Sequence, residues 1–122
     1  MATTETLYTI TIPRWLPPTA NQLMRGKLRD RIKLGKAARQ MVGWYWWESK
    51  HRLATGKRRV GLRVTAGPGR RFGDADAYWK SVLDALTACG AIRTDSHLWV
   101  ELSPVEFVRG TEDETQITLE EL

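Results

Sequence analysis

The sequence predicts a two-layer α+β protein in which one mixed sheet packs against two helices. Strand-like and helix-like segments alternate along the chain and two further strands close it, in the order β-α-β-α-β-β. A length of 122 residues suits one domain, so residues 1–122 are predicted to form a single domain. With 42% hydrophobic and 27% charged residues, the composition is that of an ordinary globular protein.

The N-terminal half contains a predicted strand and a predicted long helix. The strand covers Leu7 to Ile12, where β-branched residues alternate until Pro13. Two consecutive prolines make residues 13–21 a loop. A helix is expected from Arg29 to about Leu53, ended by Thr55-Gly56, because apolar residues recur every three or four positions. The core-facing residues of this helix are predicted to be Leu34, Ala38, Met41, Val42 and Tyr45.

The C-terminal half is predicted to contain a strand, a second helix and a closing hairpin. The strand covers Val60 to Thr65. The second helix runs from about Asp74 to Ala88 and is ended by Gly90. Leu98 to Val108 and Gln116 to Leu119 are expected to pair as a hairpin. The apolar stripe of the second helix is predicted to be Ala75, Trp79, Val82, Leu83 and Leu86.

Charge is distributed unevenly along the chain. Residues 1–71 carry 16 Lys and Arg and three acids, residues 72–122 carry three basic residues and 11 acids, and the total is +5. A strongly basic segment attracts phosphate backbones and releases their counterions, which favours nucleic acid as the partner. A solvated basic face balanced by acids elsewhere is the alternative. The residues predicted to contact DNA phosphates are Arg70, Arg71, Arg31, Lys33, Lys36 and Arg39.

Several classes of protein do not fit the sequence. No apolar run approaches the ~20 residues of a membrane span, so no membrane partner is expected. Met1 to Thr11 lacks the pattern of a secretory signal, and a cytoplasmic location is expected. The single cysteine, Cys89, excludes an internal disulfide, and with only two His the chain lacks the ligands of a structural zinc site. Walker A and dinucleotide-binding patterns are absent, so no nucleotide cofactor is expected.

The most informative segment surrounds the start of the second helix. Asp74 and Asp76 lie at this start, Lys80 follows one turn later, and Asp95 comes after the helix end. Mg²⁺ takes hard oxygen ligands, such as two or three carboxylates with waters and phosphate oxygens. Bare carboxylates in a basic chain would repel DNA, and a bound metal removes that repulsion. The pattern therefore indicates a Mg²⁺-dependent phosphodiester reaction in which Lys80 stabilises charge on the phosphorus oxygens.

The same residues also have simpler interpretations. Asp74 can be a helix N-cap, Asp76 a first-turn acid, and Lys80 the salt-bridge partner of Asp76. Asp95 can be a turn residue. Two alternatives to an enzyme follow: a non-catalytic DNA-binding protein, and an interaction module that uses the aromatic residues at 44–47.

One protein family has a similar pattern of residues. The pattern consists of Asp74-Ala75-Asp76, Lys80, Asp84-Ala85-Leu86-Thr87, Gly90 and Asp95, and it resembles the signature of the RusA family of Holliday junction resolvases. The N-terminal strand and Pro17-Pro18-Thr19-Ala20-Asn21 are also similar to that family. Ala77 stands where the family usually has Asn, and Thr94 replaces the first member of its later acidic pair.

The resemblance implies a RusA-like fold and a crossover junction endodeoxyribonuclease. Such an enzyme acts as a Mg²⁺-dependent homodimer in DNA recombination and repair, and nicks four-way DNA junctions symmetrically. By matching positions, Asp74, Asp76 and Asp95 would bind the metal and Lys80 would be the catalytic lysine. The expected location is the cytoplasm of a bacterial cell or of a phage-infected host.

A homodimer is also expected from the residues themselves. Resolving a junction takes two equivalent cuts, and the chain has one acidic cluster. A rotation of ~100° per helical residue points Trp47 away from the predicted core face and places Trp44 and Trp46 beside it. The surplus aromatic side chains suit a partner chain, which is favoured over stacking on unpaired bases.

Overall fold

The computed structural model describes residues 7–122, which form a five-stranded mixed sheet and three helices. The elements are β1 (Leu7–Pro13), α1 (Ala20–Met24), α2 (Leu28–Glu48), β2 (Arg58–Ala66), α3 (Ala75–Ala88), β3 (Val100–Leu102), β4 (Glu106–Arg109) and β5 (Glu114–Glu121). The predicted α+β class with a mixed sheet is confirmed. Among residues 7–122, none of the helices combines the length and the hydropathy that a membrane span requires. The secretory-signal prediction for Met1 to Thr11 lies partly outside the described residues.

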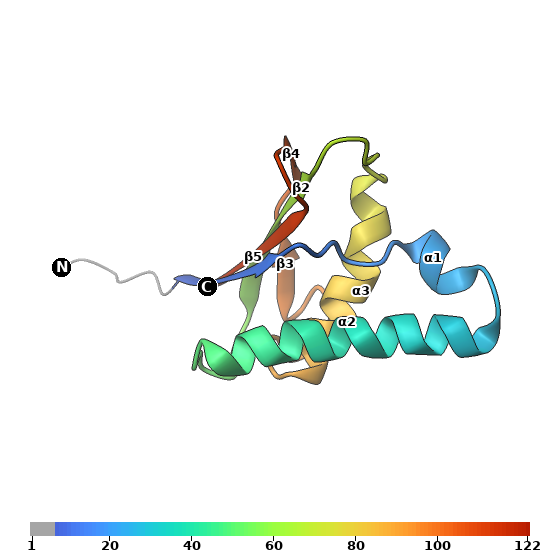
Figure 1. Ribbon diagram of the computed structural model, residues 1–122. Helices are drawn as coiled ribbons and strands as arrows, with labels where there is room; N and C mark the ends of the chain where they lie inside the picture. The colour runs from blue at the N-terminus through green and yellow to red at the C-terminus, as the bar shows by residue number, and fades with distance from the viewer. Residues whose placement is uncertain (1–6) are drawn as a thin grey trace.

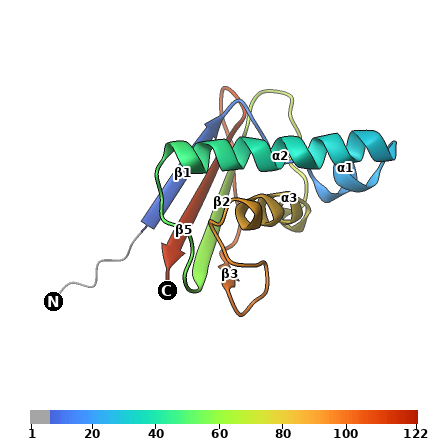
Figure 2. The ribbon, with the colours of Figure 1, turned by 90° about the horizontal axis from the view of Figure 1, so that it is seen from below.

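The sheet has one face covered by helices and one open face (Figures 1 and 2). Its strand order is β1-β5-β2, and β3 and β4 lie one after the other along the remaining edge of β2. Along β1, Tyr8, Ile10 and Ile12 are buried and the residues between them are exposed, and β5 alternates in the same way between buried and partly exposed residues. This period of two directs one face toward α2 and α3, which gives the two layers.

Only the C-terminal half of α2 packs over the sheet, while its basic N-terminal half extends past the sheet beside α1 (Figure 2). The buried residues of α2 are Ala38, Val42 and Trp46, which form one stripe with a spacing of four. Trp46 is 2% exposed and belongs to the core, which corrects its predicted place beside the stripe. Met41, predicted to face the core, is 36% exposed because the stripe is centred on Val42.

The helix α2 ends at Glu48, five residues before the predicted end at Leu53. Lys50 takes a left-handed backbone conformation with a φ of 55°, which a right-handed helix cannot continue through. The turn brings the His51 ring against Trp46, with 4.9 Å between the ring centroids. The helix is shorter than predicted because the chain turns at Lys50 and His51 packs on Trp46 instead of continuing the helix.

The helix α1 occupies part of the segment predicted to be a loop. Thr19 caps it: the Gln22 N–H donates to Thr19 Oγ1 at 3.3 Å, and the Thr19 N–H donates to Gln22 Oε1 at 2.8 Å. Pro17 and Pro18 are buried just before it, and the Pro18 carbonyl accepts the Ser81 hydroxyl of α3 at 2.8 Å. The predicted element order lacks α1 and counts β3 and β4 as one strand.

The predicted closing hairpin is wrong. The segment from Leu98 to Val108 contains β3 and β4, which both pair parallel with β2, whereas β5 pairs antiparallel with the other edge of β2. The connection from β4 to β5 therefore crosses the end of β2. The Gly110 N–H donates to the Ala66 carbonyl at 3.0 Å, and the Gly67 N–H donates to Asp113 Oδ1 at 2.9 Å. These bonds hold the crossing segment against the end of β2.

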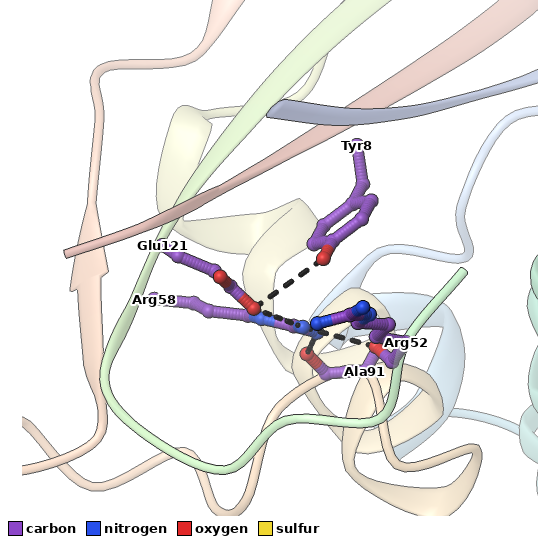
Figure 3. A network of polar contacts seen from close by, with 5 residues as sticks. All are labelled: Tyr8, Arg52, Arg58, Ala91 and Glu121. Atoms are coloured by element: carbon purple, nitrogen blue, oxygen red, sulfur yellow. Dashed lines mark hydrogen bonds and ion pairs between the residues drawn. The ribbon is translucent and has the colours of Figure 1, made fainter. Parts of the chain in front are cut away.

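A buried arginine joins four segments at the start of β2 (Figure 3). Arg58 is 1% exposed, and its Nη1 donates to the Ala91 carbonyl at 2.7 Å. Its Nη2 donates to the Arg52 carbonyl at 2.9 Å and to Glu121 Oε1 at 3.0 Å. The guanidinium lies 4.8 Å from the centroid of the Tyr8 ring. Arg58 is thus a structural cation of the core, unavailable for phosphate binding.

Candidate functional site

Two of the predicted metal ligands lie together at the start of α3. The Gly73 N–H donates to the Tyr78 hydroxyl at 2.8 Å, which ties the preceding loop to the first turn of the helix. Asp74 is the N-cap residue and Asp76 lies in the first turn, and both are exposed. The Asp74 side chain makes no capping hydrogen bond. Both carboxylates are therefore accessible to a ligand, at a helix end whose dipole favours negative charge.

Asp95 lies beyond the opposite end of α3. This helix has 14 residues, which is a length of about 21 Å at 1.5 Å per residue. The chain that leaves its C-terminal end is held there by the Ala91 N–H, which donates to the Leu86 carbonyl at 2.9 Å. Across residues 7–122, no group of three or more His, Cys, Asp or Glu could hold a metal ion. Within a single protomer, Asp74 and Asp76 therefore lie near each other, and Asp95 lies apart from them.

Lys80 lies on the exposed side of α3. Its Nζ is 3.5 Å from Asp84 Oδ2, and the two side chains are 58% and 46% exposed. An exposed pair of this kind contributes less than about 1 kcal/mol, so Lys80 can exchange its partner at little cost. The salt-bridge partner of Lys80 is Asp84, whereas the simpler interpretation assigned Asp76.

A groove of about 300 Å³ opens beside Lys80. Its lining comes from α1, α2 and α3, and consists of Leu23, Leu28, Arg31, Ile32, Gly35, Arg39, Lys80, Ser81 and Asp84. Arg31 and Arg39 therefore border the same groove as Lys80, which makes three cations against the single carboxylate of Asp84. This combination of positive charge and a concave surface suits a phosphate backbone.

The other predicted contacts on α2 lie on a different surface. We define the outer face of α2 by Arg29, Lys33, Lys36, Gln40, Trp44 and Trp47, which are all exposed. Trp44 and Trp47 are 59% and 76% exposed, as predicted for surplus aromatic side chains, whereas Tyr45 is half-buried. The four predicted phosphate contacts of α2 are therefore divided, with Arg31 and Arg39 at the groove and Lys33 and Lys36 on the outer face.

Part of the basic charge is neutralised within the sheet. On the open face, Arg59 lies 3.4 Å from Glu101 and 3.3 Å from Glu120. Arg63 lies 2.8 Å from Glu106 on the neighbouring strand. The interpretation of a balanced charged face therefore holds for β2. Among the described residues, the basic side chains of α2 and Arg71 in the loop before α3 have no ion-pair partner.

A cavity of about 370 Å³ lies next to this loop. Its lining includes Arg70 and Arg71, as well as Arg14, which the sequence analysis did not identify. Arg14 follows β1, and the antiparallel pairing of β1 with β5 brings it beside Asp113. No pattern in the sequence marks this residue, because its position depends on a strand pairing between the two ends of the chain.

The single cysteine is separate from these surfaces. Cys89 follows α3 and packs against the hydrophobic core. Burial raises the pKa of its thiol, and hydrogen bonds with the backbone at Ala91 and at Cys89 itself partly oppose this effect. A raised pKa reduces the fraction of reactive thiolate. Nucleophilic thiol chemistry is therefore not favoured at this position.

Comparison with protein-family models and with curated proteins finds no match for this chain. The candidate site comprises an exposed acidic pair at the start of α3, a groove with three cations beside Lys80, and an arginine-lined cavity before Asp74.

Proposed function

We propose that this protein is a Mg²⁺-dependent endodeoxyribonuclease that resolves four-way DNA junctions as a homodimer. The observation that carries the proposal is the exposed pair Asp74 and Asp76, which stands between Arg71 and the Lys80 groove. Acidic ligands surrounded by cations suit a reaction in which a metal ion and a DNA phosphate meet. The resemblance of this segment to the RusA signature supports the same function, in DNA recombination and repair.

The donor set at the start of α3 fits Mg²⁺. Asp74 and Asp76 offer hard oxygen ligands, and neither carboxylate is engaged in an ion pair within residues 7–122. Two carboxylates with waters and phosphate oxygens are a usual environment for this ion. When bound, Mg²⁺ would polarise the phosphoryl group and activate water for its attack. Asp95 of the same chain would not take part, because the length of α3 separates it from the pair.

The remaining residues would bind and orient the DNA. Lys80 would release Asp84 and donate from its Nζ to a phosphate oxygen, where negative charge increases during hydrolysis. Arg31 and Arg39 would hold the strand along the groove that they share with Lys80. These interactions would leave the scissile phosphate beside Asp76, one helical turn before Lys80.

A non-catalytic DNA-binding protein on the same scaffold is the second candidate function. Ala77 and Thr94, which depart from the RusA pattern, favour it, and so does the separation of Asp95 from Asp74 and Asp76. Both candidates use the same cations to bind DNA. They differ in whether a phosphodiester bond is broken, which gives the decisive test.

The test compares a synthetic four-way junction with a linear duplex, each incubated with the protein in Mg²⁺ or in EDTA. We expect paired symmetric nicks on the junction in Mg²⁺ only, because both Asp carboxylates need the metal to approach a phosphate. Binding of the junction without cleavage in Mg²⁺ would select the DNA-binding alternative. Failure to bind either DNA would select an interaction module that uses the outer face of α2.

Changing Trp47 to Ala is expected to weaken the homodimer. Truncating a buried interface aromatic commonly costs about 2 kcal/mol or more, which is roughly a 30-fold increase in the dimer Kd. Sedimentation at micromolar concentration measures this change, and Gln40→Ala on the same outer face is the control. A dimer that persists in Trp47→Ala while junction binding falls would place Trp47 on the DNA surface. A monomeric wild type that makes coordinated paired cuts would contradict the dimer itself.

A further inference from the structure

The cavity before Asp74 is lined by charged, polar and apolar residues together. Its charged lining residues are Arg14, Arg70, Arg71 and Asp113, which give a net charge of +2. The apolar part of the lining includes Trp15, Leu16, Pro17, Leu34 and Tyr78. The volume of about 370 Å³ is within the range of pockets that hold small organic ligands, roughly 300–1,000 Å³. The cavity therefore has the size and the chemistry for a ligand with an anionic group and a flat apolar group.

Asp113 holds two of the arginines that line the cavity. Its Oδ1 accepts the Gly67 N–H at 2.9 Å, and its Oδ2 lies 3.0 Å from Arg70 Nε. Its carbonyl accepts the Arg14 N–H at 2.7 Å. Asp113 is half-buried, and this one residue joins the chain after β2, through its carboxylate, to the chain after β1, through its backbone carbonyl. This geometry brings two arginines from distant parts of the sequence to the same cavity.

Arg14 is held in a strained conformation that stability alone does not explain. Its φ is 54°, in the left-handed region that costs an L-residue energy and that glycine adopts freely. Its Nε lies 3.5 Å from Glu112 Oε2, but the two side chains are 83% and 62% exposed, and such a pair contributes little stability. The backbone of Arg14 is held by Asp113, but its side chain makes only this weak exposed pair, and a strained residue of this kind is typical of a functional site. The side chain of Arg14 is therefore suited to a ligand.

We propose that this cavity binds one nucleotide of a DNA strand, with its phosphate held by Arg14, Arg70 and Arg71. Guanidinium groups match the oxygens of a phosphate, and aromatic side chains such as Trp15 receive an unpaired base. The inference depends on the proposed DNA-binding function and adds the cavity to the groove beside Lys80 as a second place where the protein contacts DNA. Because Arg71 precedes Asp74 by three residues, the bound nucleotide would be a near neighbour of the scissile phosphate.

The test measures binding of a labelled 12-nucleotide dT strand in EDTA, where no cleavage occurs, by fluorescence anisotropy at several salt concentrations. The variants are Arg14→Gly, which removes the side chain and relieves the backbone strain, and Lys57→Ala as the control. Lys57 is exposed and lies just before the first residue of β2, whereas the cavity lies beyond the last residue of β2. The nine residues of β2 span about 30 Å at ~3.3 Å each, so Lys57 is far from the cavity. Both variants lose one positive charge, so the difference between them reports on the cavity.

We expect Arg14→Gly to weaken binding about tenfold and to flatten the salt dependence by about 0.7 in log–log slope, as for one lost contact to a single-stranded phosphate. Lys57→Ala should change affinity less than twofold. Arg14→Gly should melt no lower than the wild type, because glycine tolerates the backbone at this position. Equal affinities of the two variants would overturn the inference. So would competition by free dTMP at the concentration at which the strand binds, because that would indicate a site for free nucleotides.

This experiment separates the cavity from the proposed nuclease activity. If the wild type does not cleave junctions but Arg14→Gly loses strand binding, the nucleotide site stands and the nuclease proposal fails. If junctions are cleaved and Arg14→Gly binds the strand as tightly as Lys57→Ala, the nuclease stands and the nucleotide site fails.

Discussion

Asp76→Asn is expected to reduce junction cleavage by at least about 100-fold while junction binding in EDTA stays equal or becomes tighter. Loss of an outer-shell partner of a metal ligand already costs about 10–100-fold, so loss of a direct ligand should cost more. The substitution preserves the size of the side chain and removes one exposed negative charge near the DNA. Binding should therefore not suffer, because the repulsion of phosphates decreases. Cleavage rates at saturating Mg²⁺ and anisotropy in EDTA measure the two effects.

A matched control for this variant is Asp30→Asn on α2. Asp30 is exposed in the first turn of a different helix, and the substitution makes the same change of charge. Cleavage by Asp30→Asn should stay within about twofold of the wild type, because a lost exposed charge acts only through screened interactions. Full cleavage by Asp76→Asn at saturating Mg²⁺ would remove Asp76 from the metal site. Equal losses in both variants would indicate a general electrostatic effect instead of a lost ligand.

Elements with a complete local pattern could be predicted from the sequence. The first strand was expected at residues 7–12 and is observed at Leu7–Pro13, because alternation and a proline define it. The helix α3 begins one residue after its predicted start and ends at Ala88, as predicted. Gly90, two residues later, adopts a φ of 80°, which is typical of a helix end. These patterns depend only on residues within one or two turns of each other.

The order of the strands could not be predicted in the same way. The segment from Leu98 to Val108 alternates well enough to form a strand, but nothing local states that its partner is β2. The choice depends on β2, which is paired on both edges and lies at the centre of the sheet. The end of α2 was also missed, because the packing of His51 on Trp46 is a tertiary effect.

In the candidate site, too, local arrangements could be predicted from the sequence and long-range ones could not. Asp76, Lys80 and Asp84 lie on one side of a helix, and their common side follows from a spacing of four residues. The separation of Asp95 depends on the length of α3, which places flanking residues at opposite ends. Arg14 reaches the arginine cavity only through the pairing of β1 with β5. The positions of Asp95 and Arg14 therefore depend on the three-dimensional fold and could not be predicted from sequence spacing.

Arg58→Met is expected to lower the free energy of unfolding by about 2–6 kcal/mol. The substitution leaves two carbonyl groups, those of Ala91 and Arg52, without the donors that now satisfy them, and each such loss costs about 1–3 kcal/mol. Glu121 also loses its cation, but its side chain is 41% exposed and water can replace part of that contact. Methionine keeps most of the apolar volume, so the loss reports on the polar network shown in Figure 3.

The neighbouring residue provides the control for this prediction. Arg59 also contacts two carboxylates, at 3.4 and 3.3 Å, but its side chain is 39% exposed. Arg59→Met should therefore cost less than about 1 kcal/mol, because exposed ion pairs are screened by water. Urea unfolding measures the free energy of unfolding of both variants. In thermal unfolding, a fall in Tm of roughly 10 °C is expected for Arg58→Met alone. Equal unfolding midpoints for the two variants would mean that the buried guanidinium adds nothing beyond an exposed pair, and that its contacts only offset the cost of burying the charge.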